Sequence, residues 1–204
     1  MTLDAIDRAF VARWQSRQPA VPASPAPRNE ERLKESSLAA DNLGDPELVT
    51  RLLAAGGRQW SILADEIEAA RLAGQRVIGV AGGERAEGRT TLVACLAHTL
   101  RDRGRDVVVL AATTARTACS RDPVDGGRPH DKRIVVVDAG IWFPPGPIRR
   151  QRLLMASLGC DAAILVRRAD REPAPARAAA LAAVGVTVLG EVVTFAPATT
   201  GDAA

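Results

Sequence analysis

Residues 76–91 read RVIGVAGGERAEGRTT, and this stretch decides the fold. A short β-branched run leads into a glycine-rich turn, which opens a helical pattern that extends to about Arg103. Four residues separate Gly83 from Gly88, and Arg89 and Thr90 follow directly. A strand, a glycine loop and a helix in this order suit an anion, because the loop amides turn inward and the helix N-terminus attracts negative charge. The stretch therefore predicts a phosphate-binding loop.

The chain on either side of this loop alternates between apolar runs and helical segments. Continuous apolar strands separated by helices are typical of a parallel sheet that is covered on both faces. The predicted fold class is therefore α/β, a doubly wound and mainly parallel sheet with helices on both faces. Beyond the strand at 76–81 and the helix at 89–103, strands are predicted at 106–111, 133–138, 162–166 and 186–190 (or through Val193), and helices at 45–57, 60–74 and 174–184.

Four segments are predicted along the chain: an amphipathic helix at 1–17, a Pro/Ala-rich linker at 18–44, the α/β domain at 45–196 and a disordered tail at 197–204. The first helix places apolar residues such as Phe10 and Trp14 at helical spacing. The prolines that follow favour an extended tether. Two interpretations stay open for this helix, packing back on the domain or docking onto a protein partner.

Composition excludes several classes of protein. The 204 residues, 47% hydrophobic, suffice for one domain with a core, and the net charge of +3 does not indicate a polybasic surface. No run approaches the roughly 20 apolar residues of a membrane span, and no secretory pattern begins the chain, so a cytoplasmic location is expected. Cys95, Cys119 and Cys160 lack metal-ligand spacing, which predicts reduced thiols and no metal cluster.

The chain resembles the MinD/ParA class of P-loop ATPases, and within it the bacterial tyrosine kinase domains of capsule and exopolysaccharide biosynthesis. The resemblance covers roughly residues 60–195 and is carried, in order, by RVIGVAGGERAEGRTT, RGRDVVVLAATTAR, DKRIVVVDAGIWFPPG, GCDAAILVRRADRE and VGVTVLGEVVTF. It implies a P-loop NTPase-type fold, with ATP and Mg²⁺ as the ligands if the loop still binds nucleotide. The implied nucleotide-binding residues are Gly83, Glu87, Gly88, Arg89, Thr90 and Thr91, and the implied Mg²⁺ ligands are Thr90 and Asp138.

This sequence departs from the family at the positions that carry out catalysis. Arg89 replaces the loop lysine, and Glu84 stands where the class has a second, signature lysine. Ala111 and Thr113 occupy the Asp-x-Asp positions after the second strand, so no residue there activates a water or a hydroxyl. The chain also has no tyrosine, which removes the acceptors of an autophosphorylating relative. Together these changes predict no catalytic residues and weak ATPase activity at most.

Two further motifs have competing interpretations. Glu68 and Arg71 match part of a Glu-x-x-Arg-x-x-Arg assembly helix, but Gly74 takes the third position, so a solvated helix face is expected. Residues 142–145 (WFPP) follow the Asp138 strand at the sheet edge where ligands of open α/β folds bind. They are expected to form either a capping hydrophobic cluster or a lip that contacts a partner or a base.

Three functions from different classes remain open from the sequence. The first is a degenerate, pseudokinase-like adapter or regulator of exopolysaccharide biosynthesis or export. Its helix at 1–17 would bind a partner such as a membrane polysaccharide co-polymerase or export component, which would hold it peripherally at the inner membrane. The second is an active ATP-dependent positioning or partitioning ATPase of MinD/ParA type, whose missing acid would come from a partner or from residues 113–131. A homo-oligomer is a further open possibility. The third is an arginine-rich DNA-binding protein, although the basic residues form no evident stripe and nucleic acid is not a clear partner.

Overall fold

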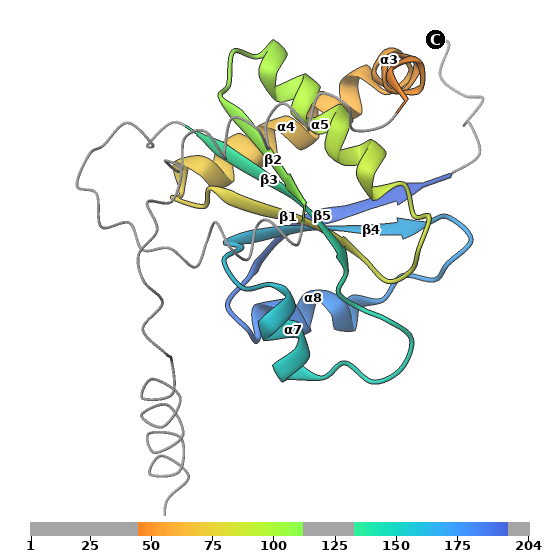
Figure 1. Ribbon diagram of the computed structural model, residues 1–204, viewed down its shortest axis with the longest axis vertical. Helices are drawn as coiled ribbons and strands as arrows, with labels where there is room; N and C mark the ends of the chain where they lie inside the picture. Colours follow the sequence, from red (N-terminus) through yellow and green to blue (C-terminus); the bar gives the residue numbers. More distant parts are fainter. Residues whose placement is uncertain (1–44, 112–132, 196–204) are drawn as a thin grey trace, which may run out of the picture. The chain divides into compact units, whose positions relative to one another are not determined.

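A computed structural model of the chain describes residues 45–111 and 133–195 (Figure 1). All of the described residues belong to one compact unit. Several sequence predictions lie outside the described residues, namely the helix at 1–17, the linker at 18–44, the tail at 197–204, and the positions Thr113 and Cys119.

Five parallel strands form one sheet in the order β2-β3-β1-β4-β5, which confirms the predicted doubly wound α/β class. Because every strand runs the same way, their carboxyl ends meet at one edge of the sheet. The strands are β1 (Val77–Gly82), β2 (Val107–Ala111), β3 (Ile134–Ile141), β4 (Ala162–Arg168) and β5 (Thr187–Thr194).

The predicted end of β3 at Asp138 is wrong, because the strand continues to Ile141. Its pairing with β1 shifts register by one residue between Val80 and Ala81, so that Val80 pairs with Asp138 but Ala81 pairs with Gly140. This bulge accommodates the extra residue and lets pairing resume beyond the aspartate.

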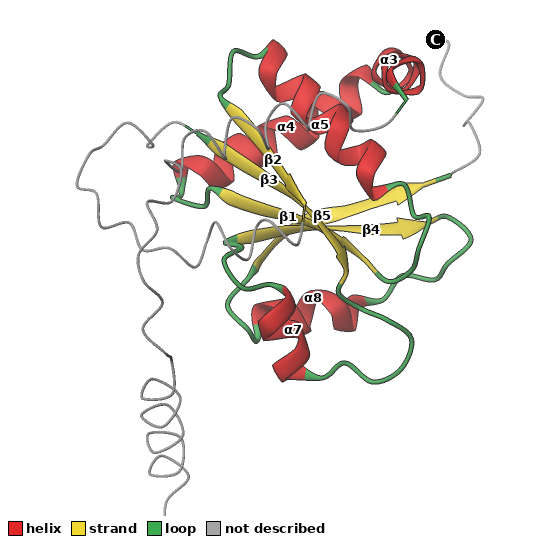
Figure 2. Ribbon diagram, in the orientation of Figure 1, coloured by secondary structure: helices red, strands yellow, loops and turns green. Residues whose placement is uncertain are grey.

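Helices cover both faces of the sheet, as predicted (Figures 1 and 2). The helices α3 (Pro46–Ala55), α4 (Gly57–Leu72) and α5 (Arg89–Asp102) lie on one face, and α7 (Arg150–Ala156) and α8 (Pro175–Ala182) lie on the other. The sequence did not predict α7, because this single short helix buries only Leu153 and carries no repeating apolar stripe. None of the described helices is long and apolar enough to cross a membrane.

The core has two layers, one on each face of the sheet. Leu96 and Leu100 of α5 pack with Ile78 and Val80 of β1 on the first face. Trp142 and Phe143, together with helix residues such as Leu181, pack against the second face. Because successive side chains of a strand point to opposite faces, each apolar strand supplies both layers at once.

The expectation of a solvated face at Glu68 and Arg71 is wrong. Their side chains are only 15% and 17% exposed, and Arg71 Nε donates to Glu68 Oε2 at 3.1 Å. Arg105, which follows α5, also forms an ion pair with Glu68. The three charges therefore join α4 to the end of α5, an arrangement in which removing one partner leaves the others uncompensated.

Cys95 provides a test of the packing of α5. The thiol is fully buried, and this burial raises its pKa from 9.0 to about 11. Because the folded-state pKa lies above the ordinary value, the thiol's contribution to stability is complete below pH 9 and is lost as the pH rises towards 11. At pH 8 we expect a thiol reagent to modify Cys95 only after unfolding, whereas half-buried Cys160 reacts in the native protein. Mass spectrometry of labelled peptides measures both rates, and equal native rates would contradict the described packing.

Candidate functional site

The site lies where two neighbouring strands send their connections to opposite faces of the sheet. The loop after β1 leads to α5, and the segment after the adjacent strand β3 leads to α7 on the other face. Such a divergence opens a crevice at the carboxyl edge of a parallel sheet. The crevice here lies between Gly83 and Glu84 on one side and residues 143–146 on the other.

The loop reaches its shape through two residues in the left-handed backbone conformation. Gly88, the N-cap of α5, has a φ of 78°, and its carbonyl accepts the Leu92 N–H at 2.9 Å. Ala86 has a φ of 57°, in a region that costs a residue with a Cβ atom about 1–2 kcal/mol. The tight turn before α5 therefore uses one glycine and one alanine in the left-handed region, with local strain at Ala86.

The Glu87 side chain lies inside the loop, with only 2% of the residue exposed. Its Oε2 and Oε1 atoms accept the backbone N–H of Gly83 at 3.0 and 3.2 Å. Arg89 Nη1 donates to the same Oε2 at 2.7 Å. A buried carboxylate therefore takes hydrogen bonds from a loop amide and a guanidinium, which are the two kinds of donor that a phosphate would use.

Arg89 is held on a second side as well. Its Nη1 also donates to the Glu84 carbonyl at 2.6 Å, while its Nε is buried without a hydrogen-bond partner among the described residues. The Glu84 carboxylate, at the position of the signature lysine, accepts from Arg171 at 2.8 Å. Arg89, at the position of the loop lysine, thus links the Glu84 backbone to the Glu87 side chain across the loop.

The rim of the loop carries paired charges. Besides Arg171 with Glu84, Arg168 Nε donates to Asp170 at 3.0 Å. This hydrogen bond is the main cause that raises the pKa of Arg168 above its ordinary value and lowers that of the Asp170 carboxyl. Because these positive groups already have acidic partners, they attract an external anion less strongly than unpaired arginines would.

Strand β5 holds the loop at residues 83–88 in place through Thr194. Thr194 Oγ1 donates to the carbonyl of Glu87 at 2.8 Å, and at 3.3 Å to the carbonyl of Arg167 in β4. The methyl group of Thr194 also lies 3.6 Å from where a Cβ on Gly88 would be. The loop is therefore fixed between the start of α5 and the end of β5.

Thr90 and Asp138, both predicted as Mg²⁺ ligands, come together. Thr90 Oγ1 donates to Asp138 Oδ2 at 2.7 Å. A hydroxyl and a carboxylate in contact fit the oxygen ligands that Mg²⁺ prefers, so this pair would hold the ion. The neighbouring strand adds no acid, since Ala111 pairs in register with Asp138. Among the described residues, no three His, Cys, Asp or Glu side chains gather as a metal cluster.

The segment after β3 closes the other side of the crevice. Trp142 and Phe143 are buried, and their backbone N–H groups donate to the Gly82 carbonyl at 3.0 and 3.2 Å, so these two residues form a capping cluster. The Arg177 guanidinium of α8 lies 5.6 Å from the centre of the Phe143 ring. A pocket of about 290 Å³ lies beside them and is lined by Gly83, Glu84, Phe143, Pro144, Pro145, Gly146, Ile148, Ala174, Ala176 and Arg177.

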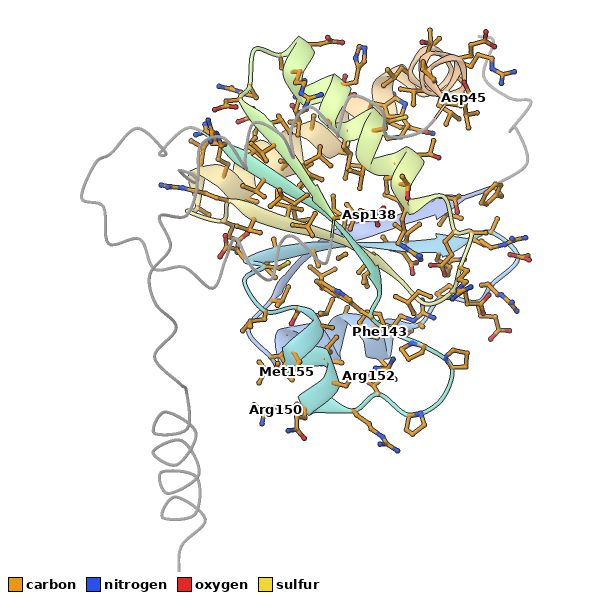
Figure 3. All side chains as sticks on the ribbon, viewed as in Figure 1. Asp45, Asp138, Phe143, Arg150, Arg152 and Met155 are labelled. Atoms are coloured by element: carbon orange, nitrogen blue, oxygen red, sulfur yellow. The ribbon has the colours of Figure 1, made fainter. Side chains whose placement is uncertain are left out.

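A larger groove, of about 590 Å³, continues along α7. Figure 3 shows Phe143, Arg152 and Met155 on the side of the sheet that carries α7 and α8. Apolar side chains, three of them prolines, line most of it, and Met155 is half-exposed. The sequence pointed to residues 142–145 but gave no sign of this groove, because α7 was not predicted.

All of the predicted nucleotide-binding residues lie in the loop or in the first turn of α5, and Asp138 reaches them through Thr90. Two contributors were not predicted, Thr194 and Arg177. Each comes from an element far along the chain. Thr194 lies in the last segment that carries the resemblance, but nothing in that segment marks its side chain, and Arg177 belongs to no motif. A parallel sheet with a glycine loop after its first strand, and a loop threonine bonded to an aspartate on the adjacent strand, defines a P-loop NTPase-type fold.

Comparison with known proteins gives distant structural similarity only. No family model and no curated protein matches the chain. Among solved structures, the kinase domain of Escherichia coli tyrosine kinase ETK is similar at 13% identity and a TM-score of 0.39, over 68% of this chain and 79% of that one. The BceF tyrosine kinase domain is similar at 16% identity and a TM-score of 0.47, over 94% of this chain and 97% of that one.

Proposed function

We propose that this chain is a degenerate P-loop protein that keeps the fold of its class without turning nucleotide over. The observation that carries this proposal is the engagement of Arg89, whose Nη1 is bonded to the Glu87 carboxylate and to the Glu84 carbonyl. A guanidinium held in this way does not follow a transferring phosphoryl group as the mobile ammonium of a lysine does. Position 111, where the family has an aspartate, is an alanine, and this change also supports a loss of nucleotide turnover.

The proposal includes a biological setting, which comes from the resemblance to exopolysaccharide tyrosine kinase domains. The protein would act as a non-catalytic adapter or regulator of exopolysaccharide synthesis or export, binding a protein partner through the segment at 1–17. Neighbouring genes for glycosyltransferases and a polysaccharide export protein would support this setting. Neighbouring genes for chromosome partitioning would contradict it.

Turnover tests the proposal directly. We expect the purified protein with Mg²⁺ and ATP to release phosphate at the background rate, because the end of β2 offers Ala111 in place of a carboxylate that would activate the attacking group. Asp138→Ala should leave that rate unchanged, as should Asp170→Ala, which removes an exposed rim carboxylate as a control. Robust Mg²⁺-dependent release that disappears in Asp138→Ala and persists in Asp170→Ala would overturn the proposal.

One observation favours a second candidate, an active ATPase of the positioning or partitioning type. The contact between Thr90 and Asp138 preserves a pair that fits Mg²⁺. Under this alternative the missing acid would come from a partner or from residues 113–131. Dimerisation that depends on ATP, measured by light scattering with and without the nucleotide, would distinguish it from the first proposal.

A further inference from the structure

The Glu87 carboxylate occupies the part of the loop where donors converge. It accepts both the Gly83 amide and Arg89 Nη1, and it is the most deeply buried acid on the described part of the chain. The donors remain oriented inward, and Arg89 Nε is buried with its proton unused by any described residue. The loop therefore presents an anion-binding arrangement that already contains an anion.

The space around this carboxylate excludes a second group. A Cβ atom built on Gly82 would lie 1.8 Å from Glu87 Oε2 and 2.7 Å from Arg89 Nη1. A phosphate that took hydrogen bonds from Gly83 and Arg89 would have to place its oxygens where the carboxylate oxygens lie. Repulsion between the two anions in this partly dry site adds to the steric conflict. The two occupants are therefore mutually exclusive.

We propose that Glu87 is an internal competitor for the loop, so that a phosphate-bearing ligand binds only after this carboxylate has swung out. The apparent dissociation constant then equals the intrinsic one divided by the fraction of molecules in which Glu87 is displaced. If about one molecule in a hundred is open, the affinity for phosphate falls about a hundredfold. The inference rests on the proposed function. A loop that binds and hydrolyses ATP in every cycle would need the Gly83 amide and Arg89 free to bind phosphate.

Isothermal calorimetry with inorganic pyrophosphate tests the competition. Glu87→Gln is nearly isosteric and removes the negative charge, and Glu87→Ala removes the whole carboxylate. Both should bind pyrophosphate at least about tenfold more tightly than the native chain. Glu172→Gln is the charge control, since it removes one negative charge at an exposed side chain outside the loop. It should change the affinity about twofold or less.

The outcomes separate this inference from the proposed function. Equal affinity in the native chain and the Glu87 variants, or an equal gain in Glu172→Gln, would overturn the competition and leave the turnover proposal intact. Hydrolysis of ATP by the native chain would overturn the proposed function instead. Thermal unfolding checks that each variant is folded. In the native chain, saturating pyrophosphate should also shift the carbon-13 resonance of the Glu87 carboxyl, and bound pyrophosphate with an unshifted resonance would contradict the inference.

Discussion

Leu96→Ala is expected to lower the free energy of unfolding by about 2–5 kcal/mol. Leu96 is fully buried in α5, within the core layer that this helix forms with strand residues such as Ile78 and Val80. Removing its side chain loses the transfer free energy of the buried carbons and leaves a cavity that a close-packed core only partly refills. For a domain of this size the melting temperature should fall by roughly 2–4 °C for each kcal/mol.

The chain offers a matched control for this change. Leu72 lies in the last turn of α4 with 78% of its surface exposed. Leu72→Ala removes the same atoms from water instead of from the core, so its effect should stay within about 0.5 kcal/mol. Urea unfolding followed by circular dichroism measures both variants, and similar losses in the two would contradict the described burial of α5.

Gly82→Ala is expected to have the second large effect, a loss of about 2–4 kcal/mol in the free energy of unfolding. The new methyl group would lie 1.8 Å from Glu87 Oε2, so the carboxylate must leave its place. Its departure breaks the charge-assisted hydrogen bond to Arg89 and leaves the Gly83 amide without its acceptor. The free energy of unfolding therefore falls for two reasons, because the new methyl group overpacks the site and because buried polar groups lose their partners.

A double-variant cycle shows whether Glu87 is the cause. In a Glu87→Ala background two of the three atoms nearest to the new methyl group are gone, and the third belongs to the flexible Arg89 guanidinium. The cost of Gly82→Ala should then fall to about 1 kcal/mol or less, a coupling that independent sites do not show. An equal cost in both backgrounds would place the strain in the strand and not in the carboxylate.

The fold followed from the sequence because its signals are local. The β-branched runs and the glycines of residues 76–91 fix strand, loop and helix within one short segment. The end of β3 was missed since a bulge depends on how a neighbouring strand pairs, and α7 was missed since one turn of packing around Leu153 leaves no periodic pattern. Patterns along the chain do not record pairing register.

The predicted site residues lie close together in the structure, but the conformation of the Glu87 side chain was not predicted. Glu87 was expected among the nucleotide-binding residues, and no spacing argument indicates that its side chain turns into the loop. That orientation depends on the bulk of Arg89 and on the donors around it, which only the folded loop brings together. Thr194 acts from a distant strand, so its contribution was beyond any local motif.

The bond from Thr194 to the Glu87 carbonyl also has a consequence for the biogenesis of the protein. The two residues are 107 positions apart, and the donor lies in the last strand of the sheet. At roughly 5–20 residues per second of translation, the loop waits about 5–20 s on the ribosome before this strand has been synthesised. Contacts between residues so distant form late, because the intervening chain must first be closed into a large loop. The nascent chain therefore displays an unbraced glycine loop throughout that interval, and the mature conformation of the site is among the last features to be assembled.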